Sequence, residues 1–87
     1  MDFEAFKKSL EEQLTFPSVY MFKFIVQASN QKIALIESLF PEEADIHQKE
    51  SNQGKYMSIT AKIVVMSSDE VIEIYKKALA IEGVIAL

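Results

Sequence analysis

The sequence contains no cysteine in its 87 residues. This absence excludes disulfide bonds, thiolate zinc sites and cysteine nucleophiles together. Because small secreted domains usually depend on disulfides, we expect this protein in the cytoplasm. Charged side chains interrupt residues 2–12, so we expect no signal peptide. No stretch approaches the ~20 consecutive apolar residues that cross a bilayer, so we expect no membrane partner.

Arginine is also absent, and all nine basic side chains are lysines. Arginine makes the bidentate contacts with phosphate and guanine on which many nucleic-acid binders rely. Such proteins also usually present a basic face, whereas the net charge here is −4. These facts disfavour a nucleic-acid-binding protein, although local clusters of lysine keep that function open as an alternative.

Glycine and proline are scarce, and each of the four stands where an element should end. Pro17 and Pro41 follow two expected helices, Gly54 lies in a polar turn, and Gly83 suits the C′ position of the last helix. No linker or repeat separates these elements, so we expect one domain over residues 1–87. The 49% hydrophobic fraction is typical of a chain that folds.

Two segments before the sheet hairpin have the three- and four-residue periodicity of amphipathic helices. The first covers residues 2–14 and should stop before Pro17. The second begins at Ser29 or Asn30, either of which can cap it, and ends at Pro41. Their predicted apolar stripes are Phe3, Phe6, Leu10 and Leu14 in the first, and Ile33, Ile36, Leu39 and Phe40 in the second.

The last helix has the clearest signals. Ser67 and Glu70 have the spacing of a capping box, and Asp69 adds negative charge at the positive end of the helix dipole. We expect Leu79 to face the sheet, so its truncation to alanine should cost about 2–5 kcal/mol. The predicted buried positions are Val71, Ile74, Tyr75, Ala78 and Leu79.

Four segments have strand character: 18–28, 44–50, 55–66 and 84–87. The order predicts an α+β fold, a ferredoxin-like βαββαβ sandwich with an additional N-terminal helix and an antiparallel four-stranded sheet. Right-handed crossovers put the first and third strands in the centre and both crossover helices on one face. The highly charged segment 44–50 suits a sheet edge. The predicted core positions are Tyr20, Phe22, Phe24 and Val26, with Met57, Ile59, Ala61, Ile63 and Val65.

The other face of this sheet is expected to be open, because both crossover helices lie on one side. It is the candidate interaction surface, for a protein partner, a homodimer or a small metabolite. The N-terminal helix must bury its apolar stripe as well, either on this face or elsewhere. The candidate residues of the interaction surface are Met21, Lys23, Ile25, Tyr56, Ser58 and Thr60.

The sequence offers few groups for catalysis or metal binding. His47 is the only histidine and has only Asp45 nearby, so a solvated edge-strand side chain is the simpler interpretation. Glu42 and Glu43 beside Asp45 lack the spacing of a calcium loop. The strand hydroxyls have no base to activate them. We therefore expect no catalytic residue, no cofactor and no metal, and we do not expect an enzyme.

Two motifs resemble a bacterial family of unknown function, the YbeD-like proteins. They are Phe16-Pro17 before the first strand and Ser51-x-x-Gly54-x-Tyr56-x-Ser58-x-Thr60 across the hairpin. The chain length, the element order and the closing segment 84–87 also fit, so the resemblance covers nearly the whole chain. It implies a ferredoxin-like fold similar to the ACT regulatory domains, which bind small metabolites beside allosteric enzymes. It implies no established activity.

Residues 54–59 also resemble the third strand of an RNA-recognition motif, which stacks bases on exposed aromatic rings. Tyr56 is the only aromatic side chain expected on the open face. We therefore put first a non-catalytic regulatory or adaptor module that acts by binding a protein or a small metabolite. The alternative is a nucleic-acid-binding domain that uses the same face.

Overall fold

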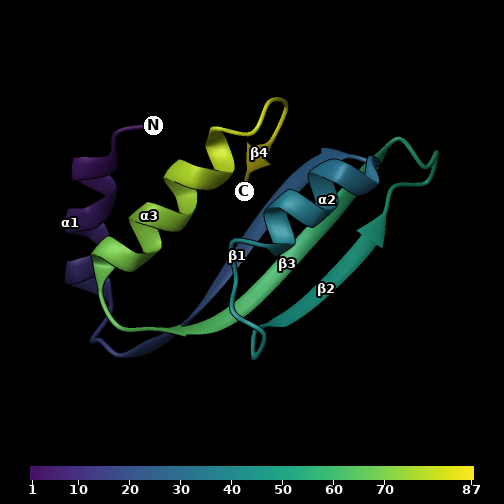
Figure 1. The fold of residues 1–87 in the computed structure, drawn as a ribbon. Coiled ribbons are helices and arrows are strands. Elements are labelled where there is room, and N and C mark those ends of the chain that lie inside the picture. Colours follow the sequence, from purple (N-terminus) through teal and green to yellow (C-terminus); the bar gives the residue numbers. More distant parts are fainter.

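The computed structural model describes residues 1–87 and has the α+β ferredoxin-like architecture that the sequence predicts (Figure 1). Its four strands form one antiparallel sheet in the order β2-β3-β1-β4. None of the helices is both long and apolar enough to cross a membrane. The elements are α1 (Phe3–Gln13), β1 (Ser18–Gln27), α2 (Asn30–Glu37), β2 (Asp45–Glu50), β3 (Tyr56–Val65), α3 (Ser68–Leu79) and β4 (Ile85–Ala86).

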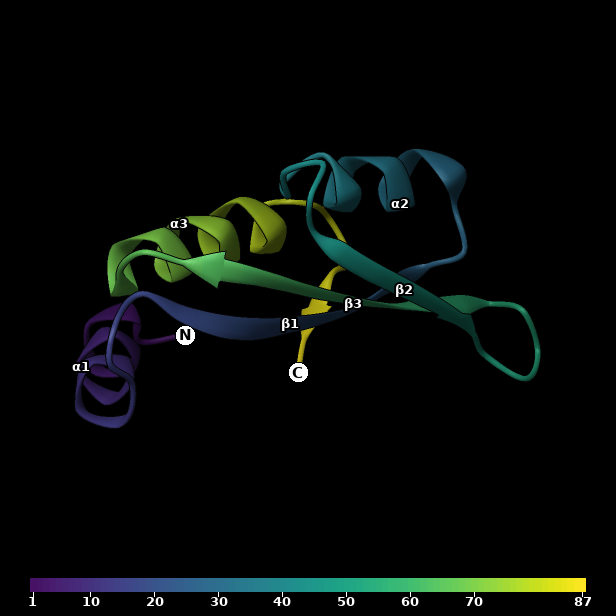
Figure 2. The ribbon, with the colours of Figure 1, turned by 90° about the horizontal axis from the view of Figure 1, so that it is seen from below.

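The two central strands carry the core. β1 and β3 pair from Ser18↔Val65 to Gln27↔Tyr56, and α2 and α3 cover the same side of the sheet (Figure 2). Alternate side chains of a strand point to opposite faces, so one set from each strand meets the helices. The polar strand β2 forms one edge, as predicted. The core side chains of the two central strands are Phe22, Phe24, Val26, Ile59, Ala61, Ile63 and Val65.

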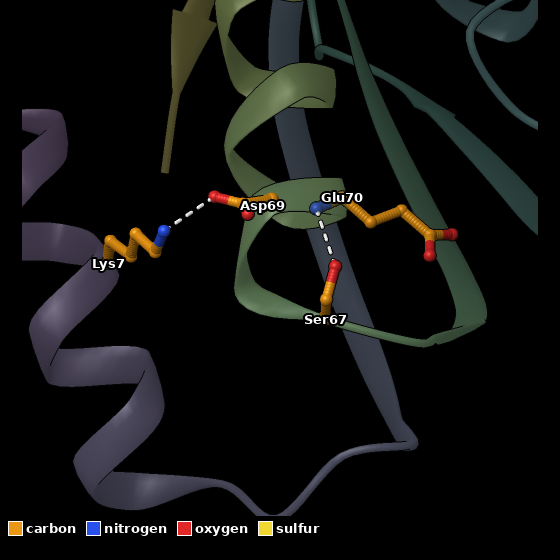
Figure 3. Close-up of polar contacts among 4 residues, drawn as sticks. All are labelled: Lys7, Ser67, Asp69 and Glu70. Atoms are coloured by element: carbon orange, nitrogen blue, oxygen red, sulfur yellow. Dashed lines mark hydrogen bonds and ion pairs between the residues drawn. The ribbon is translucent and has the colours of Figure 1, made fainter.

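The N-terminal helix α1 packs beside α3 and leaves the open face of the sheet uncovered (Figures 1 and 2). The ring of Phe6 meets the ring of Tyr75 edge-on at 5.2 Å between centroids. Lys7 Nζ pairs with Asp69 Oδ1 at 2.8 Å (Figure 3), and this hydrogen bond raises the pKa of Lys7. Leu10 is buried in the core cluster. The apolar stripe of α1 is therefore buried against α3 and the adjoining core, and not on the open face of the sheet.

The N-terminus of α3 differs in one bond from the predicted capping box. The backbone N–H of Glu70 donates to Ser67 Oγ at 3.2 Å (Figure 3), as predicted. The Glu70 carboxylate accepts from the backbone N–H of Met66 at 3.0 Å, not from that of Ser67. The bond to the Glu70 carboxylate therefore comes from a residue one position before the expected donor, and it still satisfies a backbone N–H just ahead of the helix.

The placement of Gly83 at the C′ position was wrong. α3 ends at Leu79, and its C-cap Ala80 keeps right-handed helical angles, with its N–H bonded to the carbonyl of Lys76 at 3.2 Å. Gly83 lies three residues beyond the cap with a φ of 82°. It serves the turn into β4, a conformation that a residue with a Cβ rarely adopts.

Most elements end within one residue of the predicted bounds, but α2 and β4 lose a larger part of their predicted length. α2 ends at Glu37 and not at Pro41. Beyond Glu37 the backbone N–H groups of Leu39 and Phe40 donate to carbonyls three residues back, as in a 3₁₀ turn, and not four. Both side chains still pack with the core. β4 is reduced to Ile85–Ala86, opposite Ile25 and Phe24 of β1.

The prediction that Leu79 is buried against the sheet was wrong. Leu79 is only partly buried and lies outside the core cluster, whereas Ile72 is buried. Ile72 shares one flank of α3 with Asp69 and Lys76, which lie three residues before and four after it. That flank meets α1, because Asp69 pairs with Lys7 and Lys76 Nζ lies 5.5 Å from the centre of the Phe3 ring. A second helical partner thus shifts the buried stripe of α3.

These positions predict different costs of truncation within one helix. We expect Ile74→Ala to lower the free energy of unfolding by about 2–5 kcal/mol, because it leaves a cavity in the core. Leu79→Ala removes a partly exposed side chain, and we expect a loss below about 1 kcal/mol. Urea unfolding followed by circular dichroism measures both. Equal losses would contradict the peripheral position of Leu79.

Candidate functional site

The candidate site is the open face of the sheet, on the side opposite α2 and α3 (Figure 2). Partners across a ladder share a face, so the register defines its rows. Met21 lies opposite Lys62, Lys23 opposite Thr60, Ile25 opposite Ser58, and Gln27 opposite Tyr56. All six residues of the candidate interaction surface are on this face, and their role in binding stays a prediction.

One end of the open face is apolar. Val19 and Val64 lie directly opposite each other in the ladder and are 65% and 58% exposed. Met21, two residues along from Val19 on the same face, is 53% exposed. We call these three residues the open-face apolar cluster. Val19 was not among the predicted surface residues, although it alternates with Met21 along the strand and so shares its face.

The other end of the open face is hollowed on both sides of Tyr56. The hairpin there is closed by Ser51, whose N–H donates to the Tyr56 carbonyl at 2.9 Å and whose Oγ accepts from the Tyr56 N–H at 3.1 Å. Gly54 lies in this turn, as predicted, and has a φ of 69°. A hollow of about 330 Å³ is lined by Ile25, Lys49, Glu50, Ser51, Asn52, Tyr56 and Ser58. A second, of about 400 Å³, is lined by Gln27, Ala28, Ser29, Gly54, Lys55 and Tyr56.

The open face carries more lysine than acid. Lys23, Lys62 and Lys49 point to this face, and Asp45 is the only acidic side chain that the register places on it. Asp45 lies opposite Lys62 in the β2–β3 ladder, but its carboxylate pairs with His47 at 3.0 Å. No carboxylate lies within 4.0 Å of any of these three lysines. Glu50 lies at the hairpin rim, on the opposite side of β2. The lysines are exposed and without ion-pair partners.

The structure brings Asp45 and His47 together, and places Thr60 opposite His47 in the β2–β3 ladder. The side chains of His47 and Asp45 are 73% and 64% exposed, and no hydrogen bond joins His47 to Thr60. The arrangement therefore has no nucleophile–base contact of the kind that acyl transfer uses. No group of three or more His, Asp or Glu side chains is placed to hold a metal ion, so Glu42 and Glu43 form no such site with Asp45.

Residues 11–87 match a family model described as "Protein of unknown function (DUF493)". The chain belongs to the DUF493 family. The "UPF0250 protein" of Shewanella halifaxensis is 35% identical over 78 residues, which cover 85% of this chain and 89% of the relative. Those of Shewanella amazonensis and Shewanella baltica are 30% and 31% identical, covering 87% and 85% of this chain, and 91% and 89% of the relatives.

This membership confirms the YbeD-like resemblance. No solved structure gives a significant match to the chain. The relatives are uncharacterised, and nothing in their names points to catalysis. The function of this DUF493 protein therefore has to be argued from its own surface.

The open-face cluster should be dispensable for folding. We expect Met21→Asp to lower the free energy of unfolding by about 1 kcal/mol or less, because the side chain faces solvent and only the strand preference changes. Phe22→Ala, one position along, should cost about 3–5 kcal/mol because Phe22 is fully buried. Thermal and urea unfolding compare the two. Similar losses would show that Met21 is needed for the fold.

Proposed function

We propose that this DUF493 protein is a non-catalytic adaptor or regulatory module that binds a protein partner on its open sheet face. The observation that supports the proposal most is the open-face apolar cluster of Val19, Met21 and Val64. Apolar side chains gathered on an exposed face often belong to interaction surfaces. The three side chains are each more than half exposed. The apolar stripe of α1 does not cover them, because it packs against α3 and the core.

Binding of a small metabolite, which the ACT resemblance implies, has weaker support. The hollows beside Tyr56 are of ligand-pocket size, but both are wide open to solvent, whereas ligand sites enclose most of the surface of the ligand. In the β1–α2 loop, Ser29 N–H donates to the Gln27 carbonyl and Ala28 N–H to the Lys55 carbonyl. These backbone donors are already used, so the loop offers few groups to a ligand.

Nucleic-acid binding is the second candidate, because three lysines without ion-pair partners share a face with Tyr56. A single-stranded nucleic acid usually stacks on several aromatic rings, and this face has one. The apolar cluster has no counterpart on a phosphate backbone. A protein partner uses both the cluster and the lysines, so we rank it first.

The proposal can be tested by cross-linking capture from native lysate. Captured proteins are identified, purified and tested for binding to this protein. We expect a partner that binds the unmodified protein and is lost with the double variant Met21→Asp/Val64→Asp. The matched control is Leu35→Asp, since Leu35 is an exposed apolar residue on α2, in the layer that covers the opposite face. The proposal is wrong if every reconstituted partner binds the double variant as tightly as the unmodified protein.

A further inference from the structure

We infer that the open face binds an acidic protein segment with apolar side chains, in preference to a nucleic acid or a second copy of this chain. The inference rests on the proposed function and specifies its partner. Two separate features of the face support it: the exposed apolar cluster and the unequal distribution of charge over the molecule.

The distribution of charge sets the open face apart from the rest of the surface. By the register, the face carries three of the nine lysines and one of the thirteen acidic side chains, and Glu50 lies at its hairpin rim. The other six lysines and eleven acidic side chains lie elsewhere. β1 and β3 contain no acidic residue, whereas α1 alone contains Glu4, Glu11 and Glu12. A protein with a net charge of −4 thus presents one face with an excess of positive charge.

The lysines border the apolar cluster closely enough for one segment to contact both. Lys62 lies directly opposite Met21 in the β1–β3 ladder, and Lys23 follows Met21 by two residues on the same face. Residues two apart on a strand are separated by about 6–7 Å. A segment that packs its apolar side chains on Met21 and Val64 therefore brings flanking carboxylates within reach of Lys23 and Lys62. Both lysines lack an ion-pair partner within the chain.

A second copy of this chain fits the face less well. In a twofold interface the same patch contacts itself, so two faces with the same excess of lysine would meet. Juxtaposed like charges are strongly unfavourable at an interface. The single acidic side chain on the face, Asp45, already pairs with His47. Self-association through this face would therefore leave the lysines uncompensated.

The test uses defined probes with the full-length protein. The first is a helical peptide of about 20 residues with leucines at i, i+3, i+4 and i+7 and glutamates on both flanks. The second has glutamine in place of each glutamate, and the third is a single-stranded oligothymidylate. Fluorescence anisotropy gives the dissociation constants at about 50 mM and about 300 mM salt, which span weak to strong screening. We expect the glutamate peptide to bind most tightly, and its affinity to fall as salt rises.

Variants separate charge from apolar contact. We expect Lys23→Glu/Lys62→Glu to weaken binding of the glutamate peptide about fivefold or more, from the loss of two flanking charge pairs. The matched control is Lys8→Glu/Lys77→Glu, which reverses two lysines on α1 and α3 that form no ion pair. Each lysine-to-glutamate substitution lowers the net charge by two, so both double variants have a net charge of −8, compared with −4 for the unmodified protein. The control should therefore bind nearly as the unmodified protein does.

Four outcomes would overturn the inference. Equal binding of the glutamate and glutamine peptides, both lost in Met21→Asp/Val64→Asp, would leave the proposed function standing and remove the acidic partner. Tighter binding of oligothymidylate than of the glutamate peptide would favour nucleic acid in its place. Absence of binding by the glutamate peptide, or equal losses in the two lysine double variants, would show that the charge of this face does not select a partner.

Discussion

The side chain of Tyr75, on α3, contacts both the N-terminal helix α1 and the central strand β1. Its ring lies 5.2 Å from Phe6 of α1 and 5.4 and 5.6 Å from Phe22 and Phe24 of β1, measured between centroids. Edge-to-face and tilted aromatic contacts of this kind add to the stability that burial already provides. The Tyr75 hydroxyl is hydrogen-bonded to that of Tyr20 at 3.2 Å, so burial leaves it with a partner. Burial, with this bond, raises the pKa of Tyr75 and keeps the hydroxyl neutral.

The position of α1 follows from this contact and decides which surface is free. An amphipathic helix has to bury its apolar stripe. Two apolar surfaces of this protein could receive that of α1: the flank of α3 and the open face of the sheet. Docking on α3 through Phe6 and Leu10 leaves Met21 and Val64 in solvent. The same chain folded with α1 on the sheet would have no exposed apolar cluster. The proposed binding function therefore depends on how the first helix packs.

The sequence pattern correctly predicted those parts of the fold in which an element packs against a single neighbour. The period of two in β1 and β3 predicted the core face and the open face, because each strand face has a single environment. The strand order was predicted by the succession of elements and the right-handed crossovers. α3 has two partners, the sheet and α1, so periodicity alone misplaced Leu79 and missed Ile72. Likewise, the stripe of α1 indicated that it is buried but not where. The hollows beside Tyr56 depend on how the hairpin closes over the sheet, which no local pattern encodes.

The charge of the open face is the clearest example of information that only the register supplies. Summed over the chain, the charge is −4, and that value argued against anionic partners. A docking partner, however, responds to the charges near it, because the Debye length is about 8 Å at physiological ionic strength. The shortest dimension of the molecule is 20 Å, so the acidic side chains of α2 and α3, which lie on the other side of the sheet, act only weakly on a segment bound to the open face. Such a segment interacts mainly with Lys23 and Lys62. The net charge of a small acidic protein therefore does not determine the sign of the partner that one of its faces selects.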